Sequence, residues 1–231
     1  KKRARAEAET TPTPPTAWES DERDHCETPT EAYEDVVHVL DALAAERGRT
    51  RATLKILDPY YCNGGMKRRL RRLGFEAVTN EARDAYAGDW IERARAHDVI
   101  ITNPPYSADH IDRLLRQCAS TPDVPFLLLL PSFCCAKPYY ADALRPLQRM
   151  PWFILPKKRY TYYEPFRDGA ATSPFNSFWY LHTPGMAPRS GDPRRTEMAA
   201  SAAALPAFHR DVTDASKRRP GPKQRKRLAK A

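Results

Sequence analysis

The chain has 231 residues, which is enough for one catalytic-size domain with a packed core but too few for two ordinary domains with flexible ends. Hydrophobic residues make up 41% of the chain, and the formal net charge of +9 predicts a polyanionic partner. The longest apolar run, at residues 126–130, is far too short to cross a bilayer, so we expect a soluble, intracellular protein with no membrane partner.

The five cysteines form no C-x-x-C pair, and no histidine lies at metal-ligand spacing from them. This pattern argues against a zinc site and against a disulfide framework, and it favours a reducing compartment. The cysteines are Cys26, Cys62, Cys118, Cys134 and Cys135. We therefore expect no metal.

The two ends of the chain differ from its middle. Residues 1–24 combine charge, Thr and Pro without hydrophobic periodicity, which predicts a disordered N-terminal arm. Residues 184–231 have the same character and end in a basic run, which predicts a disordered basic C-terminal tail. Residues 25–183 then form the catalytic domain. The basic termini favour a nuclear location, although such runs also serve for solubility alone.

The predicted elements begin with a helix in which apolar residues recur at helical spacing from Tyr33 to Leu43, with Thr28 and Pro29 before its start. After it, short apolar runs alternate with helical stretches. Strands are expected at 54–57, 77–79, 99–102 and 126–130, and helices at 66–73, 111–118 and 139–147. This alternation predicts an α/β fold that is doubly wound around a mostly parallel, Rossmann-like sheet.

Two further strand candidates, at 152–155 and 178–181, are joined by a long loop with no clear helix. The simplest interpretation is an antiparallel hairpin at one edge of the sheet. Between Glu81 and Asp98 the chain is short for another helix, strand and helix, so we expect this part of the fold to be trimmed.

The first strand candidate runs into the turn at residues 58–65, with the sequence Asp-Pro-Tyr-Tyr-Cys-Asn-Gly-Gly. Ligands of doubly wound sheets bind beyond the carboxyl ends of the strands, where a tight turn lets backbone NH groups approach them. The turn resembles the first cofactor-binding motif of nucleic-acid amino methyltransferases, usually Asp-Pro-Phe-x-Gly-x-Gly. The resemblance implies that Asp58, Pro59, Cys62 and Gly64 bind the cofactor. Cys62 replaces the first glycine, which makes the turn wider or shifts it toward Gly64 and Gly65.

Acidic residues follow the second strand candidate. Glu81 ends that strand, and Asp84 lies three residues later. A carboxylate at this place can accept both ribose hydroxyls of a nucleoside cofactor. The resemblance implies that Glu81 binds the ribose and Asp84 the adenine amino group. Tyr33 lies in a segment that resembles the one closing over the cofactor in the same enzymes.

The third motif is Asn103-Pro104-Pro105-Tyr106, directly after the apolar strand candidate at 99–102. It closely resembles the (Asp/Asn/Ser)-Pro-Pro-(Tyr/Phe/Trp) signature of class I methyltransferases. An exocyclic amine is a poor nucleophile because its lone pair is delocalised into the ring. The Asn103 side-chain oxygen and the Pro104 carbonyl can accept its hydrogens, which exposes the lone pair, while consecutive prolines keep the loop stiff. Tyr106 offers a face on which an extruded base can stack.

The segment at residues 157–163 follows the strand candidate at 152–155 and carries three cations and then three aromatic residues. Cations interleaved with rings suit phosphate contact and base stacking. We therefore expect it to bind the substrate through Lys157, Lys158, Arg159, Tyr160 and Tyr163. The alternative is a surface loop whose tyrosines fold back on the core.

Over residues 28–181 the chain resembles class I S-adenosyl-L-methionine-dependent methyltransferases of the Asn-Pro-Pro-Tyr type. The resemblance implies a seven-stranded sheet with a reversed edge hairpin, and methyl transfer to an exocyclic amino nitrogen of a nucleic-acid base. Asn103 favours adenine N6 over cytosine N4, and RNA is slightly favoured over DNA. Because the chain has no room for a target-recognition domain, structured RNA or a partner subunit must supply specificity.

Two other interpretations stay open. Protein-glutamine methyltransferases also carry Asn-Pro-Pro-Tyr, because an amide nitrogen has the same delocalised lone pair, but their first motif characteristically runs Asp-Leu-Gly-x-Gly-x-Gly. The second interpretation is a catalytically silent nucleic-acid-binding module that has kept this fold. The replacement of the first glycine of the cofactor motif by Cys62 favours it. The intact Asn103 motif, together with Glu81 and Asp84, argues against a silent module.

Overall fold

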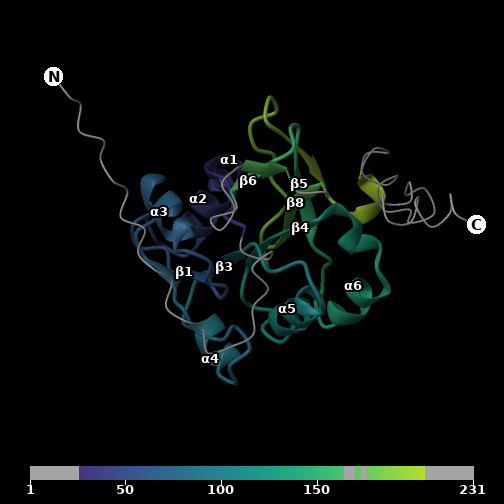
Figure 1. Cartoon of the computed structure of the whole chain (residues 1–231), viewed down its shortest axis with the longest axis horizontal. Helices are drawn as coiled ribbons and strands as arrows, with labels where there is room; N and C mark the ends of the chain where they lie inside the picture. The colour runs from purple at the N-terminus through teal and green to yellow at the C-terminus, as the bar shows by residue number, and fades with distance from the viewer. Residues whose placement is uncertain (1–25, 164–169, 173–175, 206–231) are drawn as a thin grey trace, which may run out of the picture.

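The computed structural model of the chain describes residues 26–163, 170–172 and 176–205 (Figure 1). The predicted N-terminal arm at 1–24 and the chain beyond residue 205 lie outside the described residues. The helices and strands are α1 (Thr30–Glu34), α2 (Val37–Glu46), β1 (Ile56–Asp58), α3 (Gly65–Arg72), β2 (Val78–Asn80), α4 (Trp90–Arg95), β3 (Val99–Thr102), α5 (His110–Ala119), β4 (Phe126–Pro131), the 3₁₀ helix η2 (Ser132–Ala136), α6 (Pro138–Ala143), β5 (Trp152–Pro156), β6 (Thr161–Tyr163), β7 (Ala170–Thr172), β8 (Ser177–His182), β9 (Thr196–Ala199) and the 3₁₀ helix η3 (Ala202–Ala204).

The central sheet has seven strands in the order β2-β1-β3-β4-β8-β5-β9. β1 is parallel to β2 and to β3, and β3 is parallel to β4. The other pairings, of β4 with β8, of β8 with β5 and of β5 with β9, are antiparallel. The α/β fold with seven strands is therefore confirmed. The prediction of a mostly parallel sheet is wrong, because the sheet is mixed.

The antiparallel half arises from the place of β8. The two strands of the predicted hairpin do pair, as β5 and β8, but β8 is inserted between β4 and β5 instead of lying at the edge. All six residues of β8 are buried, as in a strand that is covered on both faces. The long connection from β5 to β8 holds a separate two-stranded hairpin, β6–β7.

The edge next to β5 is taken by β9, which lies in the segment predicted to be disordered from residue 184. That prediction is wrong for residues 184–205. Phe153 of β5 pairs with Ala199, and Ala199 is buried. The strand escapes sequence analysis because only its first and last residues, Thr196 and Ala199, are buried, so it has no alternating apolar pattern.

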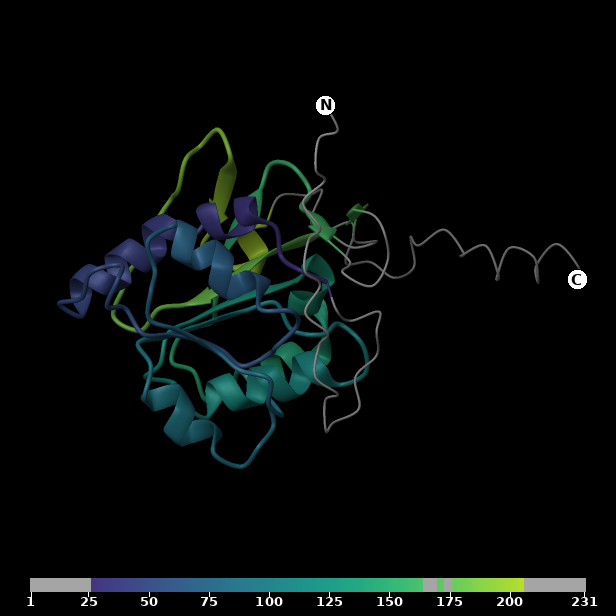
Figure 2. The same ribbon diagram turned by 60° about the vertical axis from the view of Figure 1, so that its left-hand side comes forward.

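Helices cover both faces of the sheet (Figure 2), with α1, α2 and α3 on one side and α4, α5 and α6 on the other. Neighbouring residues of a strand point to opposite faces and so belong to different cores. In β3, for example, Ile101 packs in the core under α1–α3, and Ile100 packs in the core under α4–α6. None of the helices in the described ranges is long and apolar enough to cross a membrane.

Residues 26–36, which we call the N-terminal strap, include α1 and are fastened by buried polar contacts. Asp35 accepts a hydrogen bond of 2.7 Å from the Tyr160 hydroxyl and one of 2.8 Å from Arg195 Nε. The indole of Trp179 in β8 donates a bond of 2.9 Å to the Ala32 carbonyl. These contacts hold the strap against β8, the start of β6 and the start of β9.

Candidate active site

β1 and β3 are parallel neighbours, so their carboxyl ends bring the turn at Asp58 and the motif at Asn103 to one edge of the sheet. The Thr102 hydroxyl, at the end of β3, donates a hydrogen bond of 2.5 Å to Oδ1 of Asp58. The same oxygen accepts a bond of 3.1 Å from the Tyr60 backbone NH. Because Asp58 and Thr102 are both buried, this contact joins the two motifs within the protein interior.

Burial raises the pKa of the Asp58 carboxyl to about 7, although the hydrogen bonds from Thr102 and from the Tyr60 NH act in the opposite direction. A carboxyl group with this pKa exchanges its proton near neutral pH. Acids perturbed in this way gather at functional sites, where a ligand or substrate compensates for the lost hydration. Oδ2 of Asp58 accepts no hydrogen bond from the described residues, so it is the oxygen that remains for a ligand.

The turn after Asp58 is tight at Gly64, which has a φ of +67° and precedes the first residue of α3. Asn80 at the end of β2 holds the start of the turn, because its Nδ2 donates to the Tyr60 carbonyl at 3.0 Å. Pro59 is buried and Cys62 half-buried. Burial is the main cause that raises the pKa of Cys62 to about 12, so this side chain remains a neutral thiol.

The Asn103 motif is ordered by a tyrosine hydrogen bond within the motif. The Tyr106 hydroxyl donates to Oδ1 of Asn103 at 2.7 Å and also lies 3.1 Å from the Leu129 carbonyl oxygen of β4. The hydroxyl of Tyr162 in β6 hydrogen-bonds to Tyr106 and to Ser177. Pro104 is buried, and the rest of the motif is half-buried. Asn103 is thus held in one orientation at the end of β3.

Glu81 and Asp84 are both exposed in the loop after β2. Oδ1 of Asp84 accepts a bond of 2.9 Å from the Tyr86 NH, so this carboxylate is oriented by its own turn. Beside it lies an aromatic cluster that sequence analysis missed. The Tyr86 hydroxyl contacts that of Tyr60 at 2.7 Å and Nδ1 of His110 at 2.7 Å.

The guanidinium of Arg113 covers the Tyr86 ring, with Cζ 3.4 Å from the ring centroid. Burial raises the pKa of Tyr86 to about 12, so its hydroxyl is neutral. The cluster links the turn after β1, the loop after β2 and the start of α5. The sequence gives little indication of this aromatic cluster, because its members are far apart in the chain and are not assigned a role by any motif.

The N-terminal strap reaches the same edge of the sheet. Tyr33 is buried, with its ring centroid 6.1 Å from that of Trp179. Burial is the main cause that raises the pKa of Tyr33, and the charge of Asp58 adds to it. Glu27, also buried, accepts a hydrogen bond of 2.8 Å from Nη2 of Arg69 in α3. Sequence analysis missed both Glu27 and Arg69.

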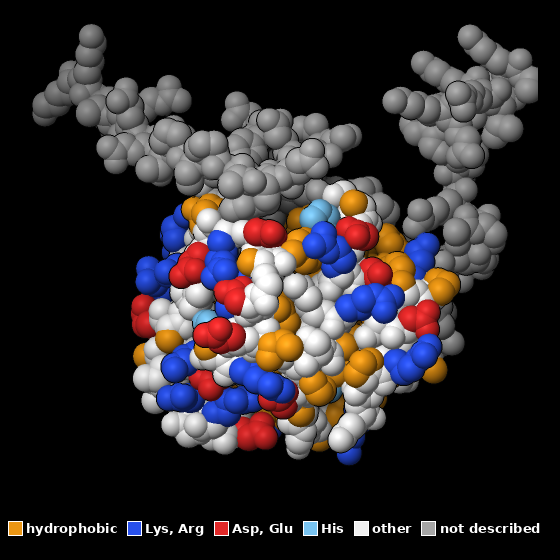
Figure 3. Space-filling view, turned by 90° about the horizontal axis from the view of Figure 1, so that it is seen from below, with side chains coloured by type: hydrophobic (Ala, Val, Ile, Leu, Met, Phe, Trp, Pro, Cys, Tyr) orange, Lys and Arg blue, Asp and Glu red, His pale blue; other side chains and the backbone are white. Residues whose placement is uncertain are grey.

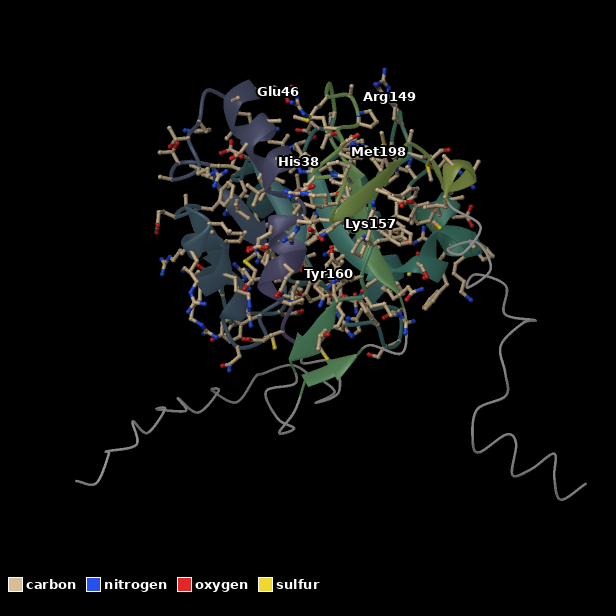
Figure 4. All side chains as sticks on the ribbon, turned by 90° about the horizontal axis from the view of Figure 1, so that it is seen from above. His38, Glu46, Arg149, Lys157, Tyr160 and Met198 are labelled. Carbon is tan, nitrogen blue, oxygen red and sulfur yellow. The ribbon has the colours of Figure 1, made fainter. Side chains whose placement is uncertain are left out.

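The predicted substrate loop at 157–163 divides into exposed cations and buried rings. Lys157, Lys158 and Arg159 are exposed, and Arg159 Nε hydrogen-bonds to Asn176. Tyr160 is only 7% exposed, and Figure 4 shows it beside the strap, where its hydroxyl binds Asp35. The expectation that a base stacks on Tyr160 is therefore wrong, because the ring folds back on the core. The side chain of Tyr163 lies outside the described residues.

Charge on the described surface is mixed. On the face shown in Figure 3, Lys and Arg side chains alternate with Asp and Glu, and no continuous basic field covers this face. Many of the arginine side chains form surface ion pairs with carboxylates, such as Arg83 with Asp89 at 2.7 Å and Arg95 with Asp123 at 3.3 Å. Within the described ranges there is also no group of three or more His, Cys, Asp or Glu side chains that could hold a metal ion.

A groove of about 640 Å³ lies along α2, lined by His38 and Glu46 (Figure 4) and by Gly185 and Arg189 of the segment after β8. α2 ends at Glu46, before the chain enters β1, and β8 runs antiparallel to β4. Both elements therefore bring their last residues toward the amino ends of the parallel strands. The groove is separate from the edge that holds Asp58 and Asn103.

Comparison of the chain with protein families, curated proteins and solved structures gives no match.

Proposed function

We propose that the chain is an S-adenosyl-L-methionine-dependent methyltransferase that acts on an exocyclic amino nitrogen of a nucleic-acid base, with adenine N6 favoured. The observation that carries the proposal is the 2.5 Å hydrogen bond between Thr102 and Asp58. It makes the Asp-Pro turn and the Asn-Pro-Pro-Tyr motif neighbours, and such an enzyme needs methyl donor and amine side by side. We infer a Rossmann-like fold. The four parallel strands in the order β2-β1-β3-β4, followed by the antiparallel β8, support this inference.

The chemistry of the Asn103 motif suits an amine that must be made nucleophilic. Oδ1 of Asn103 has two acceptor positions, and Tyr106 uses one of them. The other can accept one amine hydrogen. The Pro104 carbonyl accepts no hydrogen bond from the described residues and can take the second. Two fixed acceptors favour the pyramidal nitrogen whose lone pair is free to react, and this preorganisation lowers the barrier.

The residues around this motif fit an adenosyl cofactor. The exposed Glu81 can accept hydrogen bonds from the ribose hydroxyls. Asp84, which is oriented by the Tyr86 NH, can accept a hydrogen bond from the adenine amino group. Oδ2 of Asp58 faces the cofactor's ammonium group in this proposal, and Tyr33 closes the same space from the strap. S-adenosyl-L-methionine supplies an electrophilic methyl group when bound.

The substrate in this proposal is a polyanion that meets the loop before β6. Lys157 and Lys158 are exposed and form no ion pair with a described residue, so they are available to phosphates. Tyr106 remains the candidate for stacking on the base, since it is only half-buried. In this proposal, structured RNA or a partner subunit supplies specificity.

The direct test is methyl transfer from labelled cofactor into cellular RNA, DNA and protein, followed by mass spectrometry of nucleosides and amino acids. We expect label in N6-methyladenosine or its deoxy form with the wild type, and less label by ~10²-fold or more with Asn103→Ala. Label in methylglutamine would establish the protein substrate instead. Cofactor binding without transfer to any fraction would favour the silent nucleic-acid-binding module.

A further inference from the structure

The space above Gly65, in the first turn of α3, is filled by an ion pair. A Cβ atom built on Gly65 would lie 2.1 Å from Oε1 of Glu27 and 2.1 Å from Nη1 of Arg69. A larger residue at this position would therefore displace the ends of the Glu27 and Arg69 side chains. The glycine therefore makes a cradle, and a carboxylate from the strap and a guanidinium from α3 occupy it together.

The ion pair in this cradle is buried, and one of its groups is incompletely satisfied. The side chain of Glu27 is 5% exposed, and that of Arg69 is 18% exposed. Nη2 of Arg69 donates to Oε2 of Glu27, but Nη1 is buried and has no hydrogen-bond partner. A buried donor without a partner destabilises the folded chain, so the cradle holds a nitrogen that a second oxygen would satisfy.

The geometry of the guanidinium indicates what the cradle would hold best. Arginine binds a carboxylate most strongly when two of its NH groups meet both oxygens. Glu27 uses only one nitrogen of Arg69, because Oε1 is directed to Arg68, 3.5 Å away. A free carboxylate that is not tethered to the strap could meet both nitrogens of Arg69.

We propose that Arg69 binds the α-carboxylate of the methionine part of the cofactor, and that Glu27 is an internal competitor for this place. Glu27 leaves Arg69 when the cofactor enters and returns when it departs. The inference rests on the proposed function, because it assigns one end of the cofactor that the Asp58 turn is proposed to bind. It also explains why a buried glutamate lies on a glycine of that turn.

The proposal makes opposite predictions for the two partners. Glu27→Gln removes the competing charge with little change in size, and cofactor affinity should rise about tenfold. Arg69→Gln removes the donor to the carboxylate, and affinity should fall roughly tenfold to 100-fold, as expected for a charge-assisted hydrogen bond. Arg69→Lys keeps the charge but cannot bind with two planar NH groups, so its affinity should lie in between.

Isothermal calorimetry with two ligands tests the assignment. S-adenosyl-L-methionine has the carboxylate, and decarboxylated S-adenosylmethionine lacks only that group. The wild type should prefer the first ligand, Arg69→Gln should bind both alike, and Glu27→Gln should gain affinity for the first ligand only. Arg72→Gln is the matched control, because it removes the same charge from an exposed position in α3 and should leave both affinities unchanged. Thermal unfolding confirms that each variant is folded.

Several results would overturn the inference while leaving the proposed function in place. If the chain binds S-adenosyl-L-methionine but Arg69→Gln keeps the preference for the carboxylate, the cradle is not the carboxylate site. A loss of affinity in folded Glu27→Gln would make Glu27 a direct ligand of the cofactor instead of a competitor. If Glu27→Gln does not fold, the two Arg69 variants still decide the assignment. Absence of binding for both adenosyl ligands would refute the proposed function as well.

Discussion

Replacement of Asp58 by asparagine should stabilise the chain at neutral and alkaline pH while it impairs cofactor binding. Asparagine keeps the shape of the side chain, and its Oδ1 can still accept the hydrogen bonds from Thr102 and from the Tyr60 NH. The change removes only the ionisation of a carboxyl group that is 6% exposed. Stabilisation by the loss of a buried charge is expected where a site is built to bind a ligand and not for stability.

The magnitude follows from the pKa of Asp58, which burial raises from 3.8 to about 7. Between these values the folded chain keeps a proton that the unfolded chain has released, so stability falls as pH rises through this window. Three pKa units correspond to about 4 kcal/mol. We therefore expect wild type and Asp58→Asn to be equally stable near pH 4, and the variant to be more stable by up to about 4 kcal/mol at pH 8.

Urea unfolding at a series of pH values between 4 and 8.5 measures this difference. Subtraction of the wild-type free energy of unfolding cancels the groups that titrate in both proteins. Asp142→Asn is the matched control, because this side chain is 56% exposed and its replacement should change stability by less than about 0.5 kcal/mol. A difference that stays constant from pH 5 to pH 8, or a variant that is less stable at pH 8, would refute the reasoning. A constant difference would mean that folding does not raise the pKa of Asp58, and a less stable variant would mean that the folded chain favours the Asp58 carboxylate over a neutral amide.

Three further predictions concern the proposed reaction. Asn103→Ala should lower the rate of methyl transfer by ~10²-fold or more with nearly unchanged cofactor affinity in calorimetry, and an activity above half of wild type would contradict the assigned role. Glu81→Ala should weaken S-adenosyl-L-methionine binding by roughly 1.5–3 kcal/mol, since it removes one partner of a charge-assisted hydrogen bond, and equal affinities would exclude Glu81 from the ribose site. Combined replacement of Lys157 and Lys158 by alanine should flatten the salt dependence of nucleic-acid binding, by a slope of about one for each lost phosphate contact, without a change in cofactor affinity. If the salt dependence of binding is the same for the wild type and the double variant, with RNA and with DNA, these lysines do not contact the nucleic acid.

The placement of the Asp58 turn and the Asn103 motif at one edge of the sheet could be predicted from sequence, because each lies at the end of a short buried strand and the carboxyl ends of parallel strands share one edge. The burial of Tyr160 and Tyr162 also has a signal, since residues two apart in an extended segment point to the same side. The aromatic content of the segment at 157–163 hides this alternation, which is why the sequence suggests a substrate contact for Tyr160.

The rest depended on contacts between distant parts of the chain. Glu27 and Arg69 are 42 residues apart, and neither belongs to a recognisable motif. A signal existed for Arg69 alone, which lies one helical turn after Gly65 and so on the same face of α3. The mixed sheet was missed for a similar reason. The fully buried run in β8 indicated a strand covered on both faces, but only the tertiary structure decides which neighbours it has.

The anchoring of the N-terminal strap has a consequence for the order in which the protein folds during synthesis. Arg195 is 160 residues beyond the Asp35 that it binds, and Trp179 is 147 residues beyond Ala32. During synthesis the strap therefore leaves the ribosome long before the residues that anchor it. By then β1 can already pair with β3, and α3 can pack against them. Contacts of such long separation are slow to close. Helix α1 is thus among the last of the described elements to be fixed in place, and until then the edge of the sheet that carries Asp58 stays accessible to water and to chaperones.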